Sequence, residues 1–213
     1  MRIGRREGPG AVRDREPRVG LLGGSFNPAH RGHLHISTMA LDRLRLDQVW
    51  WLVSPQNPLK PHHDMAPLDR RLAAARGLTD HPAIHITDVE RHLGTRYTAD
   101  TLDALAQNHP DIRFVWIMGA DNLIQIPRWR RWTALFNAVP IAVFARPTYS
   151  LRALSGRAAR RFASARRLES RAGALAAMRP PAWAFLHTPL VHVSATRIRG
   201  CAMDSAGNGT EIG

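Results

Sequence analysis

Short apolar runs alternate with helix-like segments along most of the chain, and this order constrains the fold more than any other feature. The apolar runs span residues 19–26, 48–54, 83–90, 112–119, 140–146 and 182–188. Helical spacing of apolar residues covers 33–45, 68–79, 98–108, about 121–137 and 151–178. Strands that alternate with helices form a parallel sheet covered on both faces. The sequence therefore predicts an α/β fold, a Rossmann-like doubly wound parallel sheet in a single domain over residues 18–200.

The composition fits such a domain and excludes several other classes. The chain has 213 residues, of which 44% are hydrophobic, as is typical of one globular domain. No apolar run approaches the eighteen residues of a membrane helix, and residues 1–17 lack the apolar core of a secretory signal. Cys201 is the single cysteine, which excludes a disulfide framework within the chain. We expect a cytoplasmic protein with no membrane partner.

The net charge of +13 is concentrated in two segments. Residues 1–18 contain six arginines and three acidic residues, and residues 151–180 contain eight arginines and one glutamate. These segments hold ten of the thirteen surplus charges. Solvated charge runs are common, so we do not expect nucleic acid as a partner. Residues 1–17 are predicted to be a disordered basic tail, and 151–180 an Arg/Ala-rich helical insert with one face packed on the domain.

The segment VGLLGGSFNPAHRGHLHIS, residues 19–37, joins the first predicted strand to the first predicted helix. In doubly wound folds ligands bind at the carboxyl ends of strands, and the N-terminus of a helix attracts phosphate. Glycines let a ligand approach the backbone, and imidazoles donate hydrogen bonds to phosphate oxygens. Singly, His30 and His33 fit ordinary loop positions, but together at this corner they favour a phosphate site. The segment matches neither the dinucleotide-binding nor the Walker glycine pattern.

Two motifs together carry a resemblance to a known superfamily. GGSFNPAHRGHL resembles the signature loop of the nucleotidyltransferase superfamily, which has the pattern [HT]-x-G-H. VSATRIR, residues 193–199, resembles its second motif, I-S-S-T-x-x-R. The Asn-Pro pair is typical of the nicotinate-mononucleotide adenylyltransferase branch. Residues 96–105, 114–132 and 143–147 also resemble segments of that branch, so the similarity covers about 19–146 and 182–199 in the order expected of one fold.

The resemblance implies a reaction and a set of site residues. The branch transfers the adenylyl group of ATP to nicotinate mononucleotide, which gives the deamido dinucleotide precursor of NAD and pyrophosphate. It implies no protein nucleophile, so catalysis depends on positioning and charge neutralisation. The residues implied in catalysis are His30, His33 and Arg199. Those implied in binding ATP are Gly23, Gly24, Ser25, Phe26, Lys60, His62, Gly119, Asp121, Ser194, Thr196 and Arg199. Mg²⁺ is expected to bind through the ATP phosphates, and no Cys/His cluster has zinc-like spacing.

On the acceptor side the resemblance implies that Thr98 grips the nicotinate carboxylate through its backbone. Trp129 would stack on the pyridine ring and Arg146 would neutralise the mononucleotide phosphate. Simpler structural interpretations stay open for each of the three. Thr98 fits a helix N-cap, Arg146 fits a plain strand exit before a proline, and Trp129 and Trp132 are spaced like core residues of one helix face.

The chain departs from the family pattern at two places. Ala195 stands where the pattern has its second serine. Residues 201–213 are polar and glycine-rich with no helical periodicity, whereas the family continues into a helical tail, so we expect a shortened, flexible C-terminal tail.

Two alternative functions remain open. Another acceptor, such as nicotinamide mononucleotide or phosphopantetheine, would keep the superfamily but change the acceptor site. A nucleic-acid-binding domain would use the arginine-rich segments and would not need His30 or His33. The sequence predicts no oligomeric state.

Overall fold

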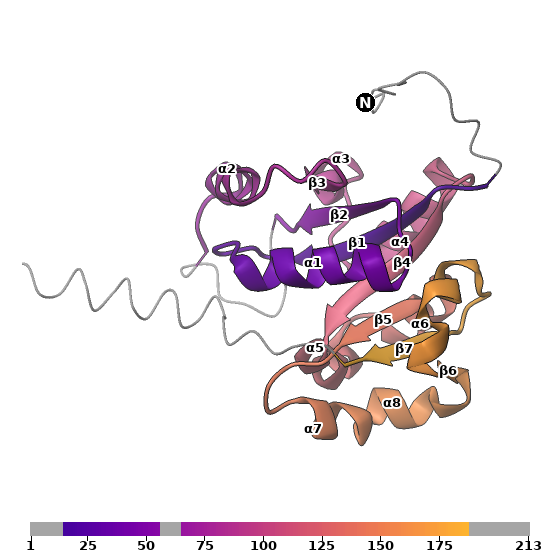
Figure 1. Cartoon of the computed structure of the whole chain (residues 1–213). Coiled ribbons are helices and arrows are strands. Elements are labelled where there is room, and N and C mark those ends of the chain that lie inside the picture. Colours follow the sequence, from indigo (N-terminus) through magenta and orange to yellow (C-terminus); the bar gives the residue numbers. More distant parts are fainter. Residues whose placement is uncertain (1–14, 56–64, 188–213) are drawn as a thin grey trace, which may run out of the picture.

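A sheet of parallel strands forms the centre of the molecule (Figure 1). A computed structural model of the chain describes residues 15–55 and 65–187. Within these residues the strands are β1 (Arg18–Gly24), β2 (Gln48–Val53), β3 (Ile84–Thr87), β4 (Arg113–Gly119), β5 (Ile141–Phe144), β6 (Arg166–Arg167) and β7 (Trp183–Leu186). Every pairing between them is parallel. The predicted doubly wound α/β sheet is therefore confirmed.

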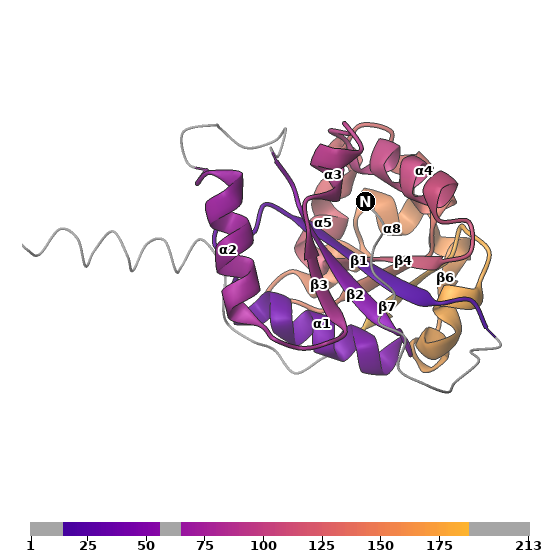
Figure 2. The ribbon, with the colours of Figure 1, turned by 90° about the horizontal axis from the view of Figure 1, so that it is seen from above.

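The strand order is β3-β2-β1-β4-β5-β7-β6. Figure 2 shows β3, β2, β1 and β4 side by side. The chain winds outward from β1 to β3, then returns to place β4 on the other side of β1. The order thus reverses between β1 and β4, and in folds of this kind the crevice at the carboxyl ends of such strands is where ligands bind.

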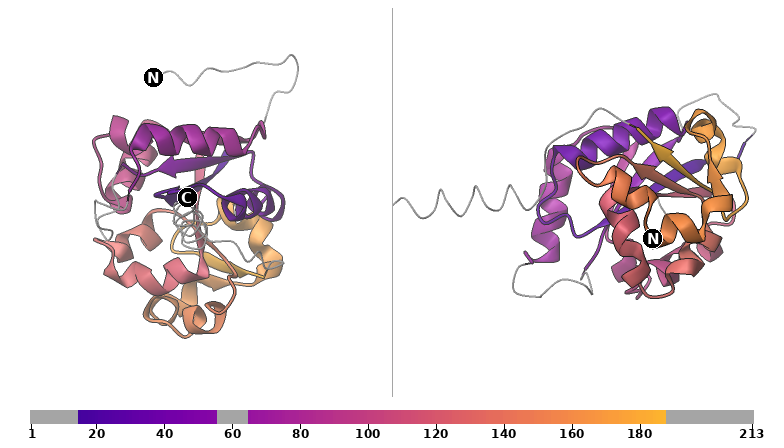
Figure 3. Two further views of the ribbon diagram at one scale, coloured as in Figure 1. Left: turned by 90° about the vertical axis from the view of Figure 1, so that its left-hand side faces the viewer. Right: turned by 90° about the horizontal axis from the view of Figure 1, so that it is seen from below.

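Helices cover both faces of the sheet. In chain order the helical elements are α1 (Arg31–Arg43), α2 (Leu68–Leu78), α3 (Val89–His92), α4 (Thr98–Asn108), α5 (Ala120–Gln125), the 3-10 turn η2 (Ile126–Arg128), α6 (Trp132–Ala138), α7 (Ser150–Leu154), α8 (Arg157–Arg161), η3 (Ala163–Ala165) and η4 (Glu169–Ala177). Figure 3 (left) faces the carboxyl ends of the strands, with α1 (indigo) and the pink helices on opposite sides of the sheet.

The two faces arise because successive strand side chains point in opposite directions. Leu21 and Trp116 belong to a core cluster that includes side chains of α4, α5 and α6. Leu22 and Ile117, one residue further along the same strands, belong to a second cluster with side chains of α1, α2 and η4. Strands buried on both faces read as continuous apolar runs, which is why their positions could be predicted.

The predicted helix over 121–137 is wrong as a single element. The structure divides it into α5, η2 and α6. Pro127 lies in η2, and Arg131, with φ 54° and ψ 33°, adopts the left-handed conformation just before α6. A left-handed residue cannot continue a right-handed helix, so the segment turns here.

The predicted continuous helix over 151–178 is also replaced by shorter pieces, namely α7, α8, η3, β6 and η4. The expected apolar face is correct at Leu154, Ala158, Phe162 and Ala165, which pack in or against the core. It is wrong at Leu151, which is 85% exposed. The insert adds the edge strand β6 beside β7, so it extends the sheet.

Across residues 15–55 and 65–187, none of the helices combines the length and the apolar character that crossing a bilayer would require.

Candidate active site

Two histidines cap the N-terminus of α1 reciprocally. The backbone N–H of Gly32 donates to Nδ1 of His30, and the backbone N–H of His30 donates to Nδ1 of His33, both at 3.1 Å. The ring centroids lie 3.9 Å apart. Because Nδ1 accepts in both rings, the proton of each neutral imidazole lies on Nε2. The capping bonds therefore fix the tautomer in which Nε2 carries the proton. In that tautomer Nε2 can donate a hydrogen bond to an anion.

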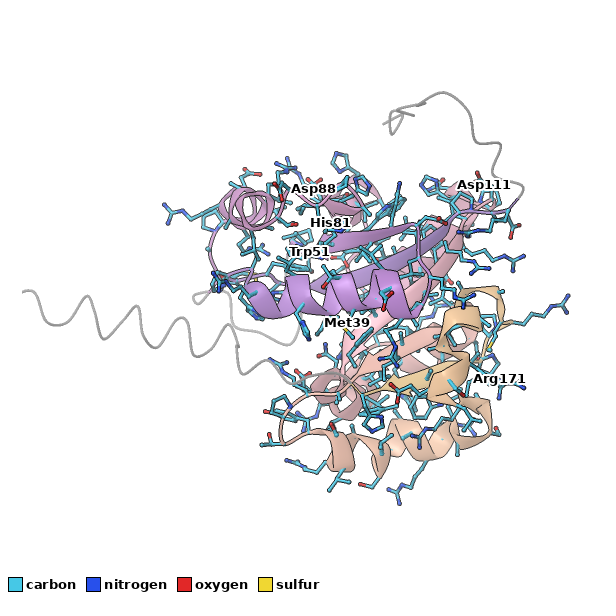
Figure 4. The ribbon with its side chains drawn as sticks, in the orientation of Figure 1. Met39, Trp51, His81, Asp88, Asp111 and Arg171 are labelled. Carbon is cyan, nitrogen blue, oxygen red and sulfur yellow. The ribbon has the colours of Figure 1, made fainter. Side chains whose placement is uncertain are left out.

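A stack of buried aromatic side chains packs against this pair. The ring of Phe26 lies 4.6 Å from that of His33 and stacks on Trp51 at 5.1 Å. Trp51 lies beside α1 (Figure 4), and its Nε1 donates to Oγ of Ser37 at 2.7 Å. Ser37 in turn donates to the backbone carbonyl of His33 at 2.8 Å. These contacts hold the first turn of α1, and with it the His33 ring, against β2.

An ion pair between Arg146 and Asp121 links the residues that follow β5 and β4. A guanidinium nitrogen of Arg146 donates to Oδ2 of Asp121 at 2.5 Å. Burial lowers the pKa of His30, and the positive charge of Arg146 lowers it further. His30 is 9% exposed, so burial and the nearby cation both favour its neutral form. The carboxyl ends of β1, β4 and β5 thus converge, as the reversal of strand order predicts.

Gly119 is required by the carboxylate of Asp121. A Cβ at position 119 would lie 2.6 Å from Oδ1 of Asp121, which is closer than real contacts allow. That Oδ1 is buried and, among the described residues, has no hydrogen-bond partner. Glycine therefore leaves room beside the backbone for this acceptor oxygen, which has capacity to accept a hydrogen bond.

Gly23 and Gly24 end β1, and Phe26 lies in the loop that follows. A Cβ on Gly23 would lie 2.3 Å from the Trp116 ring, whereas one on Gly24 would make an ordinary contact with Phe26. Phe26 has φ 45° and is 2% exposed. Its side chain is core, so any contact of Phe26 with ATP is left to its backbone. Ser25 is half-buried, and its carbonyl accepts a hydrogen bond from Arg71.

The sequence analysis missed Arg71, which joins three segments around this corner. Arg71 is 2% exposed. Its guanidinium donates to the carbonyls of Ser25, Ser54, Pro55 and Ala66 at 2.6, 2.8, 3.0 and 2.8 Å respectively. These carbonyls belong to the loop after β1, the end of β2 and the approach to α2. The one signal in the sequence was an arginine beside Leu72 on the face of α2 that carries apolar residues.

Of the three predicted acceptor residues, Thr98 comes from α4 and Trp129 from the segment between η2 and α6, whereas Arg146 follows β5. Tyr97, not Thr98, is the N-cap of α4, and no side-chain capping bond is made there. The N-cap interpretation of Thr98 is therefore wrong, since Thr98 is the first residue of the helix. Trp129 is half-buried against the core. The guanidinium carbon of Arg130 lies 4.8 Å from the centre of the Tyr97 ring, which brings the two segments together.

Two further alternatives from the sequence can be compared with the structure. Trp132 is half-buried and packs edge-on against Phe136 and Phe162 at 6.2 and 5.8 Å, so it lies against the core rather than within it. Arg146 is not a plain strand exit, because it forms the ion pair with Asp121.

Several predicted site residues lie outside the described residues. They are Lys60, His62, Ser194, Thr196 and Arg199, together with Ala195 and the tail over 201–213. Within residues 15–55 and 65–187, no three His, Cys, Asp or Glu side chains gather as a metal-binding group.

Comparison with known proteins gives close relatives over most of the chain. A protein of Cereibacter sphaeroides named "Probable nicotinate-nucleotide adenylyltransferase" is 58% identical over 181 residues, which are 85% of this chain and 96% of that protein. A protein of Methylorubrum extorquens with the same name is 56% identical over 182 residues, 85% of this chain and 98% of its own.

A solved structure and a family model agree with these relatives. The Plasmodium falciparum nicotinic acid mononucleotide adenylyltransferase, complexed with NaAD, matches with a TM-score of 0.65 at 15% identity, over 86% of this chain and 83% of that one. At this identity the match supports the fold alone. The model of the cytidylyltransferase-like family matches residues 21–200. The chain therefore belongs to the cytidylyltransferase-like family and, within it, to the nicotinate-nucleotide adenylyltransferases.

Proposed function

We propose that the chain transfers the adenylyl group of ATP to nicotinate mononucleotide and releases pyrophosphate. The observation that carries this proposal is the reciprocally capped pair His30 and His33, whose ring centroids lie 3.9 Å apart at the N-terminus of α1. The chain that holds this pair is 58% identical to a protein named as a probable nicotinate-nucleotide adenylyltransferase. The pair supplies two Nε2–H donors where the strand order reverses, which suits a polyphosphate.

In the proposed reaction an oxygen of the nucleotide phosphate attacks the α-phosphorus of ATP. A new phosphoanhydride bond forms, the bond from the α-phosphorus to the bridging oxygen breaks, and pyrophosphate leaves with that electron pair. No protein nucleophile takes part. His30 and His33 donate hydrogen bonds to phosphate oxygens on which charge builds up. Such fixed donors act mainly through electrostatic stabilisation and positioning.

The ion pair of Arg146 and Asp121 gives each of them a role beside the histidines. Asp121 occupies one guanidinium nitrogen of Arg146 at 2.5 Å, and an arginine has further N–H donors for a phosphate. We assign these to the phosphate of nicotinate mononucleotide, and the buried Oδ1 of Asp121 to the ribose or adenine of ATP. Thr98 and Trp129 are assigned to the nicotinate carboxylate and ring.

The remaining assignments rest on the family motifs. Gly23, Gly24, Ser25 and Phe26 would approach ATP through the backbone. Lys60, His62, Ser194, Thr196 and Arg199 would contact its phosphates.

Mg²⁺ is the ion we propose for the phosphates of ATP. Since no three metal-ligating side chains gather among the described residues, phosphate oxygens would hold the ion, as is usual for Mg²⁺. When bound it would neutralise part of the phosphate charge. We also propose the cytoplasm as the place of the reaction.

The direct test is Mg²⁺-dependent release of pyrophosphate from ATP by the folded full chain. Nicotinate mononucleotide, nicotinamide mononucleotide and phosphopantetheine are supplied separately. We expect strong release with nicotinate mononucleotide. Release with phosphopantetheine instead would reject the assignments of Thr98 and Trp129, and release with none of the three would reject the proposed activity of this chain.

A further inference from the structure

Arg130 and Arg131, two residues of the segment that carries Trp129, both contact the beginning of α4. Arg130 lies over the ring of Tyr97, the residue before α4. One guanidinium nitrogen of Arg131 lies 2.7 Å from Oδ1 of Asp100, and another lies 3.2 Å from Oδ2 of Asp103. The first turns of α4 and the segment that leads into α6 are therefore joined through these side chains.

The backbone at Arg131 shows that this junction is not an incidental surface contact. Its φ of 54° and ψ of 33° are left-handed, a conformation that is unfavourable for a residue other than glycine. The three charged side chains are between 37% and 48% exposed, and exposed ion pairs contribute little to overall stability. The contacts with Asp100 and Asp103 thus fix a local geometry more than they stabilise the fold.

We propose that Arg131, through Asp100 and Asp103, is a positioning residue that sets the separation of Trp129 from Thr98 and so preorganises the nicotinate-binding site. This inference rests on the proposed function. Thr98 precedes Asp100 in the first turn of α4, and Trp129 lies two residues before Arg131. A ligand held between two separate elements binds more tightly when their spacing is fixed in advance.

A direct contact between the charge of Arg131 and the ligand would predict the opposite effect of removing Asp100 and Asp103. If Arg131 itself bound the anionic acceptor, removal of Asp100 and Asp103 would free its guanidinium and strengthen binding. If Arg131 acts by positioning, loss of either side of the ion pair weakens binding. The sign of the effect in the aspartate variant therefore separates the two roles.

The test compares Arg131→Gln, Asp100→Asn with Asp103→Asn, and the triple variant. The control is Arg15→Gln, which also removes an exposed ion pair, with Asp47 at 2.9 Å, but from the residues that precede β1. For each protein we would measure KM for nicotinate mononucleotide, KM for ATP and kcat, and the binding of nicotinate mononucleotide alone by calorimetry. Thermal unfolding verifies that each variant is folded.

We expect KM and Kd for nicotinate mononucleotide to rise about fivefold to tenfold in both the arginine and the aspartate variants. KM for ATP and kcat should stay within about twofold, and the triple variant should be no worse than either parent, because the partners act as a unit. Tighter binding in the aspartate variant, or an arginine variant that matches Arg15→Gln, would overturn the proposal. A wild-type chain that does not use nicotinate mononucleotide would instead reject the proposed function.

Discussion

At the scale of single residues, the ring of His30 performs two tasks with two different atoms. Nδ1 accepts the N–H of Gly32 and so caps α1, whereas Nε2 carries the proton proposed to meet phosphate. Asparagine is a strong N-cap whose side-chain oxygen takes the place of Nδ1, but it has no donor at the position of Nε2. Substitution can therefore separate the structural task from the proposed catalytic one.

We expect His30→Asn and His30→Ala to lower kcat by about 10²–10³-fold, the usual cost of a lost donor to developing charge. Only His30→Ala also loses the cap, so it alone should be less stable, by about 1 kcal/mol. Steady-state kinetics and urea unfolding on both variants give the comparison. Wild-type kcat in His30→Asn would show that the ring serves only as a cap.

At the scale of secondary-structure elements, the strands that read as apolar runs were predictable, whereas the short edge strand β6 and the breaks between helices were not. Both faces of β4 are buried, so an uninterrupted apolar run marks it in the sequence. The turn before α6 depends on the left-handed Arg131, which Asp100 and Asp103 hold from α4. Nothing local in the sequence specifies such a contact, and the same is true of the pairing of Arg146 with Asp121 across two strand ends.

The His30 and His33 corner was predictable for a different reason. Its chemistry lies within one short segment, between the end of one strand and the start of the next helix. The predicted helix start near His33 lies two residues after the actual start at Arg31. The difference arises because histidine is not among the usual N-cap residues, so the cap at His30 could not be recognised.

The junction of β1, β2 and α2 depends on Arg71, and we predict that Arg71→Ala destabilises the chain by about 3–5 kcal/mol. The substitution leaves four backbone carbonyls without their donor in a buried place. Arg71→Lys should recover only part of the loss, since one ammonium cannot reach all four. The measurement is the free energy of unfolding in urea. The neighbouring Arg70, which is exposed, provides a matched Arg70→Ala control that should change it little.

At the scale of the whole molecule, two glutamates give the stability opposite dependences on pH. Burial raises the pKa of Glu90 to about 7 from an ordinary 4.5, although a hydrogen bond with Ser54 acts to lower it. Burial also acts to raise the pKa of Glu169, but hydrogen bonds from His187 and Arg43 outweigh it and leave that pKa below its ordinary value. Glu90 therefore favours the folded state at low pH, and Glu169 favours it at high pH.

The folded pKa of Glu90 lies above its unfolded value, so its contribution is complete below about pH 4.5 and is lost as the pH rises through about 7. A rise from 4.5 to about 7 corresponds to roughly 3 kcal/mol. Glu90→Gln should remove this decline, and the variant should be more stable than wild type at pH 8. Urea unfolding at several pH values between 4 and 8 measures it, and an unchanged pH profile would contradict the assignment.

Glu169→Gln should show the reverse behaviour. Its carboxylate accepts from Arg43 at 2.7 Å and from the backbone and ring of His187 at 2.9 and 2.7 Å, and so connects the insert to α1 and to the end of β7. Because its pKa is depressed, this contribution is present above about pH 4.5 and is lost as the pH falls. The variant should therefore be less stable than wild type at pH 7, and the difference should shrink as the pH falls below about 4.5, in the same unfolding measurements.

The packing of Gly23 against Trp116 has a consequence for how sequences of this family diverge. The indole of Trp116 occupies the space that a side chain at position 23 would need. A Cβ at position 23 would lie 2.3 Å from the nearest ring carbon of Trp116. Neither position can change alone without a clash or a void. The two sites should thus covary, so that relatives with alanine or serine at position 23 carry a smaller residue at position 116. An alignment in which tryptophan at 116 coexists freely with side chains at 23 would show that the strands move apart instead.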